Sequence, residues 1–238
     1  MLIFLDLETS GMEKEDRICS LGVLLFENEK FVTKEYGIVN EGKKIAPSAS
    51  AQHNITDEMI TDKPSFKESS IYKLLESHNN FETTLIVHNQ FFILEKLEHS
   101  GLKWHGKIID TQRVVKHLVP DLESFALEFL RYELKLYRKE EPLKELCGIK
   151  DALIAHHALS DVLVIKLLFD YLADEKDMEA MYNLSFESVL LEKFPFGKYS
   201  GRYIEEIAMN ERSYLQWMLS LQNLDDDLRY SLEYYLKG

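Results

Sequence analysis

Short apolar runs alternate with longer segments of helical spacing along the first 175 residues. The apolar runs predict β-strands at 2–5, 18–26, 31–39, 84–87 and 108–111. Short polar connections join the first three runs, which is typical of an antiparallel meander. Polar residues follow the run at 2–5 directly, so we expect this strand to deliver polar groups to one edge of the sheet.

Helical patterns lie between and after these strands. Apolar residues recur at helical spacing in segments 50–60, 92–100, 111–118, 122–136 and 151–172. Thr56 before two acidic residues is a helix-start signal, Pro120 ends the third helix, and a break near Ala158 interrupts the last. Strands followed by helices predict an α/β domain with a mixed β-sheet.

The composition changes after residue 172. Residues 173–190 are acidic and irregular, and we interpret them as the joint between two domains. The predicted units are residues 1–175 and a small, aromatic-rich C-terminal module at 190–238, in which most rings are expected to form the core.

Composition and charge restrict the function classes. With 238 residues and 45% hydrophobic content, the chain can bury a sizeable core. Cys19 and Cys147 provide neither a disulfide framework nor a zinc set. No apolar run approaches 18 residues and the start lacks a basic segment, so we expect a cytoplasmic protein with no membrane partner. The net charge of −13 argues at first against a polyanionic partner.

Two carboxylates follow the first strand. Asp6 and Glu8 are two positions apart, so both side chains point to the same side of the strand. Their mutual repulsion would raise the pKa of one of the two carboxyl groups, and a bound divalent cation would remove this repulsion. The alternative is a solvated strand end with two unrelated acids.

A histidine and an aspartate open the last long helix. His156 and Asp161 are five positions apart and can face the same cleft. Oxygen ligands favour Mg²⁺ or Mn²⁺ over zinc, and a histidine near such a site is a candidate general base. The alternative is a solvated histidine at a helix start. His88-Asn89 and the segment 52–56 are weaker signals, which also fit an ordinary turn and a capped helix.

Together, in this order, these features resemble the DEDDh 3′–5′ exonucleases. The matching segments are Asp6-Leu7-Glu8-Thr9 with Gly11, Val87-His88-Asn89, Asp110-Thr111, His156 with Asp161, and the loop through His53. The tail, with Phe196-Gly197-Lys198-Tyr199-Ser200-Gly201, resembles the C-terminal module of exodeoxyribonuclease X-like enzymes. The resemblance implies an RNase H-like mixed β-sheet flanked by helices.

The resemblance also implies an activity. Such an enzyme hydrolyses phosphodiester bonds at DNA 3′ ends, single-stranded or frayed, with two Mg²⁺ or Mn²⁺ ions, and releases nucleoside 5′-monophosphates. Asp6, Glu8 and Asp161 would hold the metal, and His156 would act as the base. The bound cations would also reverse the local charge where the phosphate lies. DNA repair and replication are the expected settings, and the motifs do not distinguish DNA from RNA.

Eight residues are candidates for substrate contact. Met12 follows a glycine at the predicted cleft rim, and Lys198 and Arg202 flank glycines that permit close approach of a backbone. The full set is Leu7, Thr9, Met12, His53, His88, Asn89, Lys198 and Arg202.

One position departs from the family pattern. Ile93 stands where the second motif has an aspartate that supports the second metal, and an isoleucine cannot bind a cation. The sequence therefore leaves open a weakened exonuclease or an impaired nucleic-acid-binding protein. Glu95 would point away from the site, and Lys96 is a minor candidate for a fixed charge in place of the second metal.

A basic stripe offers a possible path for a DNA backbone. Arg131, Lys135, Arg138 and Lys139 would share one face if the segment were helical. The alternative is a solvated helix face, because acidic residues interrupt the stripe.

Overall fold

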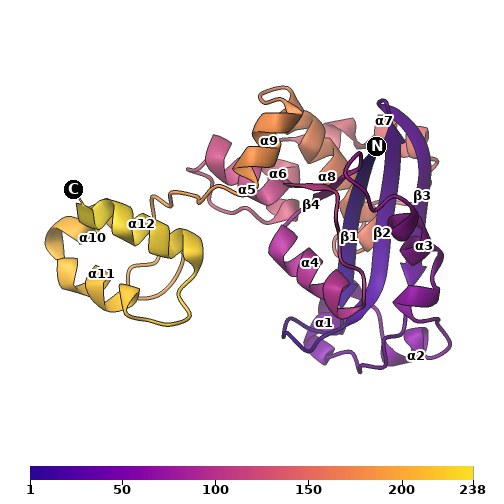
Figure 1. Cartoon of the computed structure of the whole chain (residues 1–238), viewed down its shortest axis with the longest axis horizontal. Helices are drawn as coiled ribbons and strands as arrows, with labels where there is room; N and C mark the ends of the chain where they lie inside the picture. Colours follow the sequence, from indigo (N-terminus) through magenta and orange to yellow (C-terminus); the bar gives the residue numbers. More distant parts are fainter. Residues whose placement is uncertain (238) are drawn as a thin grey trace.

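A five-stranded mixed β-sheet organises the larger part of the molecule. The computed structural model describes residues 1–237. The strands are β1 (Leu2–Thr9), β2 (Ile18–Glu27), β3 (Lys30–Ile38), β4 (Thr84–Val87) and β5 (Lys107–Asp110), and Figure 1 shows the long strands β1 to β3 side by side. The strand order is β3-β2-β1-β4-β5. β1, β2 and β3 pair antiparallel, which confirms the predicted meander, whereas β4 and β5 run parallel to β1.

Helices cover both faces of this sheet because successive strand residues point to opposite faces. Phe4, Leu24 and Ile86 face the side covered by α5 (Thr111–Leu118), α6 (Leu127–Glu133), α7 (Glu140–Cys147) and α8 (Ala158–Ala173). Ile3, Leu5 and Leu85 face the other side, covered by α3 (Ser70–Ser77) and α4 (Gln90–His99). Four further short elements are α1 (Pro47–His53), α2 (Asp57–Ile60), η1 (Phe66–Glu68) and η2 (Leu136–Lys139).

The helix predicted over 122–136 is interrupted, and the prediction that four basic residues share one helical face is wrong. α6 ends at Glu133, and Lys135 adopts a left-handed φ of 57° before η2 begins. Lys135, Arg138 and Lys139 therefore do not continue the face of Arg131. Arg131 itself is buried and paired with Glu140.

Residues 173–190 are not an irregular joint throughout. α9 (Met178–Leu184) lies within this segment and contacts β5 and α5. Met181 is fully buried in the same core as α8. Its apolar side chain explains why the acidic segment still folds onto the larger unit.

A small helical module ends the chain. Figure 1 shows α10 (Ile204–Asn210), α11 (Arg212–Leu219) and α12 (Asp226–Lys237) at one end of the molecule, beyond an extended segment after α9. Phe194, Tyr199 and Leu215 belong to the module's own core. Several other rings, including Trp217, are exposed.

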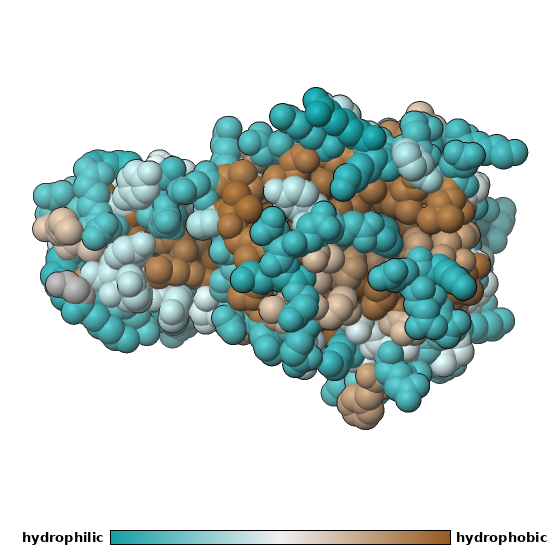
Figure 2. All heavy atoms as spheres, turned by 90° about the horizontal axis from the view of Figure 1, so that it is seen from above, coloured by the Kyte–Doolittle hydropathy of each residue, from teal (hydrophilic) through white to brown (hydrophobic). Residues whose placement is uncertain are grey.

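A buried ion pair joins the module to α5. Arg113 Nη1 and Nη2 donate to Asp227 Oδ2 and Oδ1 at 2.9 and 3.1 Å, and Val189 N donates to Asp227 Oδ1 at 2.9 Å. Hydrophobic residues gather on the face in Figure 2 where the module meets the larger unit. A cavity of 740 Å³ at this joint is lined by both parts, including Phe125 and Phe194.

Two further expectations concern cysteines and membranes. Cys19 and Cys147 are both free and buried, which confirms that they form no disulfide. Within residues 1–237, no helix has the length and apolar character needed to cross a membrane.

Candidate metal centre

Close packing brings the start of α8 over the centre of β1. Asp6 pairs in register with Gly22 on β2. A Cβ at Gly22 would lie 2.3 Å from the Ala158 carbonyl oxygen, so only glycine lets the helix backbone approach here. The start of α8 therefore packs on β2 directly beside Asp6, and the helix also contacts β1.

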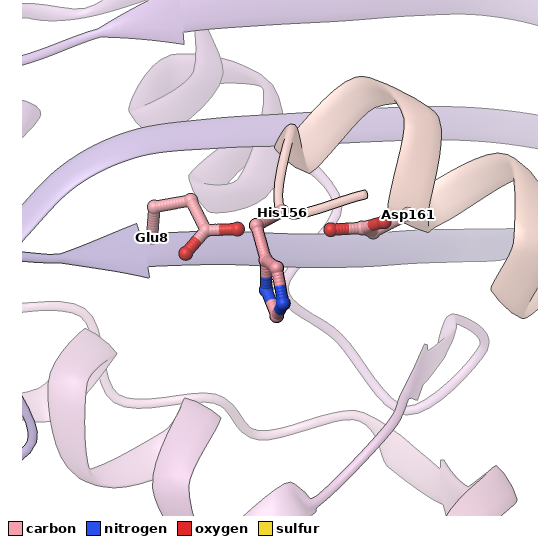
Figure 3. A group of neighbouring side chains, drawn as sticks. All are labelled: Glu8, His156 and Asp161. Carbon is pink, nitrogen blue, oxygen red and sulfur yellow. The ribbon is translucent and has the colours of Figure 1, made fainter. Parts of the chain in front are cut away.

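Three predicted residues meet at this point. Ligand atoms of Glu8, His156 and Asp161 all lie within 4.8 Å of one another. Figure 3 shows Glu8 on its strand, Asp161 on its helix and His156 on the segment before that helix. His156 is exposed and has a left-handed φ of 59°, a conformation that costs energy in a non-glycine residue.

A neighbouring histidine anchors this segment. His157 is the N-terminal flanking residue of α8, and its ring stacks on Tyr36 at 4.4 Å between centroids. This contact ties the segment before α8 to the edge strand β3.

The pKa values show that the charges of these carboxylates are compensated only in part. Burial, followed by the charges of Glu8 and Glu128, raises the pKa of Asp161 to about 8. Burial raises the pKa of Glu8 to about 7. Burial, followed by the charges of Asp161 and Glu8, also raises the pKa of Asp6.

The donor set fits a hard divalent cation. Asp161 Oδ1 is buried and has no hydrogen-bond partner. An oxygen-rich set with one histidine suits Mg²⁺ or Mn²⁺. Asp6, Glu8 and Asp161 are the residues that would hold it.

A cavity of 240 Å³ surrounds these groups. The lining residues are Asp6, Leu7, Glu8, His88, Ala126, Leu127, Glu128, His156 and Asp161. Glu128 was missed by the sequence analysis. It stands alone at the start of α6, and no spacing pattern connects it with the other acids.

The ends of β4 and β5 support the site rather than supply ligands. Asp110 accepts hydrogen bonds from the backbone amides of Asn89, Gln90 and Gln112 at 2.9–3.0 Å. Asn89, with a left-handed φ of 74°, is the N-cap of α4. Asp110 thereby holds the starts of α4 and α5 together.

His88 lines the cavity, but both of its ring nitrogens have hydrogen-bond partners within the protein. Its Nδ1 lies 3.0 Å from Thr111 Oγ1, and its Nε2 lies 2.8 Å from the Phe125 carbonyl oxygen. Burial lowers the pKa of His88. The ring thus connects the end of β4 to the loop that precedes α6.

His53 also has a structural position. It is 7% exposed, Nδ1 accepts the Ile55 N–H at 3.0 Å, and Nε2 must therefore donate to the Thr9 carbonyl at 3.0 Å. The Thr9 hydroxyl donates to the Gly11 carbonyl at 2.6 Å. These contacts hold the end of β1, and burial lowers the pKa of His53.

Met12 lies on a braced loop after β1. Its side chain is 81% exposed. Asp16 accepts from Ser10 Oγ at 2.8 Å and from Glu13 N at 2.9 Å, which closes the loop around Met12. A hydrophobic side chain is thus held in solvent next to the strand that carries Glu8.

Ile93 and Lys96 point into the protein. Ile93 is 2% exposed, packs in the core beneath α4 and does not line the cavity. Lys96 Nζ donates to the Glu13 carbonyl at 2.5 Å. The idea that Lys96 replaces a metal is therefore wrong, because its charge braces the Met12 loop instead.

Lys198 and Arg202 lie on the C-terminal module. Both are exposed, and each has an acidic partner: Lys198 pairs with Glu211 at 3.3 Å, and Arg202 pairs with Glu206. Neither residue lines the metal cavity.

Comparisons with known proteins agree with this architecture. Residues 3–169 match the Exonuclease family, and residues 194–225 match the exodeoxyribonuclease X-like C-terminal family. Exodeoxyribonuclease 10 of Escherichia coli K12 is 26% identical over 242 residues, covering 100% of both chains. DNA polymerase III subunit epsilon of Treponema pallidum is 28% identical, over 64% of this chain and 76% of the relative.

A solved structure shares the fold. Exonuclease X in complex with 5′-overhanging duplex DNA aligns with a TM-score of 0.59 at 22% identity, over 78% of this chain and 99% of that chain. This likeness confirms the predicted RNase H-like sheet flanked by helices. The family match covers most of the chain, and the protein therefore belongs to the exonuclease family.

Proposed function

We propose that this protein is a 3′–5′ exodeoxyribonuclease that releases nucleoside 5′-monophosphates with two divalent cations. The observation that carries the proposal is the meeting of Glu8, His156 and Asp161 within 4.8 Å beside Asp6. The names of the full-length relative and of the DNA-bound structural neighbour support DNA as the substrate.

The site residues have different roles in the proposed hydrolysis. Asp6, Glu8 and Asp161 would hold the cations, which would supply charge stabilisation at the phosphate and activation of water. His156 accepts the proton of the attacking water. The water oxygen bonds to phosphorus, the bond to the 3′-oxygen breaks, and that oxygen takes a proton from solvent, while His156 later returns its proton to solvent.

The substrate is a DNA 3′ end, single-stranded or frayed from a duplex. Exposed Met12 contacts the terminal base, and Leu7 lines the cavity beside the scissile phosphate. Lys198 and Arg202 contact phosphates farther along the strand. A cytoplasmic location and roles in DNA repair and replication are part of this proposal.

The test uses 5′-labelled DNA incubated with Mg²⁺ or Mn²⁺. We expect stepwise shortening from the 3′ end and release of nucleoside 5′-monophosphates. An Asp6→Ala variant is the matched control because it loses a central carboxylate. Equal absence of shortening in both proteins would contradict the proposal.

A second candidate function is nucleic-acid binding without hydrolysis, and Ile93 is the observation that favours it. No carboxylate stands at this position, and the side chain is buried in the core. DNA binding with intact affinity, combined with no shortening in either cation, would favour this second function.

A further inference from the structure

We propose that Glu128 is a fourth carboxylate of the cation site and supplies the acidic group that is missing at Ile93. The inference rests on the proposed function and adds a cation ligand that lies outside the motifs. Glu128 lines the same cavity as Asp6, Glu8 and Asp161. It reaches that cavity from α6 instead of from α4.

The framework places Glu128 firmly. The carbonyl of Phe125, three residues earlier, lies 2.8 Å from His88 Nε2. α6 then packs against α8, the helix that carries Asp161. The start of α6 is therefore held between the end of β4 and the first turns of α8.

Two carboxylate oxygens in this cavity are buried without partners. Within residues 1–237, Asp161 Oδ1 and Glu128 Oε1 are the carboxylate oxygens that are buried and accept no hydrogen bond. An unpaired buried acceptor costs free energy, and the cost is larger when the group is charged. Divalent cations held in this cavity would remove this cost.

The nearby arginine compensates the site only in part, because a second carboxylate shares it. Arg131 donates through Nε and Nη2 to both oxygens of Glu140, at 2.6 and 2.9 Å. Its third contact, from Nη1 to Glu128 Oε2, is 3.2 Å long. Arg131 thus fixes one oxygen of Glu128 and leaves Oε1 free to bind a cation.

The inference is tested on the full chain by titration with Mn²⁺ alone, without nucleic acid. The variant is Glu128→Gln, which keeps the side-chain length and loses the charge. Glu133→Gln is the matched control, because Glu133 lies on the same helix and is exposed. Thermal unfolding without cation checks that both variants fold.

We expect Glu128→Gln to weaken the lower-affinity Mn²⁺ site by roughly 10- to 100-fold, as removal of supporting groups does at other metal sites. Calorimetry near pH 8.5 measures the affinity, and the Mn²⁺ electron paramagnetic resonance signal counts bound ions. Glu133→Gln should bind like the wild type.

The outcomes separate this inference from the proposed function. Equal Mn²⁺ binding by both variants and the wild type would overturn the role of Glu128 alone. If the wild type binds no more Mn²⁺ than an Asp161→Asn variant, and neither binds the ion, the proposed function is overturned as well.

Discussion

Two buried aspartates show how different the metal cavity and the interdomain joint are. Asp161 is 6% exposed and Asp227 is 8% exposed, so burial does not distinguish them. At the joint, both oxygens of Asp227 accept hydrogen bonds from Arg113, and one also accepts from Val189. In the cavity, Asp161 has an oxygen with no partner and lies near the acids Glu8 and Glu128.

Under the proposed function, this difference separates a buried charge that stabilises the fold from one that binds a cation. A buried carboxylate with an arginine and an amide is compensated within the protein. A buried carboxylate beside two others lacks such compensation, and in the proposed function a cation would supply it. Removing the charge should therefore change stability in opposite directions at the two places.

The largest expected effect is on activity. Asp161→Asn should lower exonuclease activity by at least about 10²- to 10³-fold, because charge stabilisation at the phosphate is lost. The same variant should be more stable than the wild type when cations are absent, near pH 8.5. Labelled-DNA assays and chemical unfolding with a chelator measure the two effects.

A cation-free Asp161→Asn protein that is less stable than the wild type would contradict this comparison. Asp227→Asn is the reference at the joint. It should lose stability, because Arg113 then remains buried with a neutral partner.

The next effect concerns the stability of the joint. Arg113→Met leaves Asp227 buried and unpaired, so we expect the free energy of unfolding to fall by about 3–5 kcal/mol. Urea unfolding measures this loss. Lys107→Met at the exposed pair with Glu179 is the control, with an expected change of about 0–1 kcal/mol.

Arg113→Met combined with Asp227→Leu should recover part of the loss, because no unpaired charge then remains. Val189 N loses its acceptor, so recovery should be incomplete. If the double variant is no more stable than Arg113→Met, the unpaired charge is not the cause of the loss.

A smaller effect is the pH dependence of the cavity. The pKa values of Glu8 (about 7) and Asp161 (about 8) lie above the unfolded values of about 4. Between pH 4 and 8 the cation-free folded state therefore binds more protons than the unfolded chain, and its stability falls as pH rises.

Mn²⁺ requires deprotonated ligands, so its stabilising effect should grow with pH. We expect a larger Mn²⁺-induced increase in melting temperature at pH 8.5 than at pH 6, measured by calorimetry. The Asp6→Ala variant should lose most of this increase. An equal increase at both pH values would show that these carboxylates do not bind the ion.

The smallest effect is expected at the exposed ion pairs of the module. Lys198→Gln and Arg202→Gln should each weaken DNA binding less than about tenfold and lower the salt-dependence slope by about 1. Binding titrations at several salt concentrations measure the slope. Lys237→Gln, an exposed lysine at the end of α12, should leave the slope unchanged.

Local pattern was enough to predict much of the fold. The meander β1–β3, the strands before His88 and Asp110, and the start of α8 near Ala158 follow from periodicity and turn residues. The interruption at Lys135 and the helix α9 were not predicted. Both depend on packing against α8 and β5, which a short window of sequence does not contain.

Only part of the candidate site could likewise be predicted from the sequence. Asp6 and Glu8 share a strand face, and His156 and Asp161 share a helix start, so their proximity follows from short spacings. Glu128 has no such spacing. Lys96 was assigned to the wrong place, because its partners lie on a loop far away in the sequence.

The sequence by itself determined the family motifs, the strand and helix periodicities, and the absence of a carboxylate at position 93. Only the tertiary structure decided which buried charges have partners. Asp110 and Asp227 acquire theirs from distant segments, whereas Asp161 and Glu128 each keep an oxygen without one. The physical reason is that compensation of a buried charge depends on groups brought together by the fold, and periodicity along the chain carries no information about them.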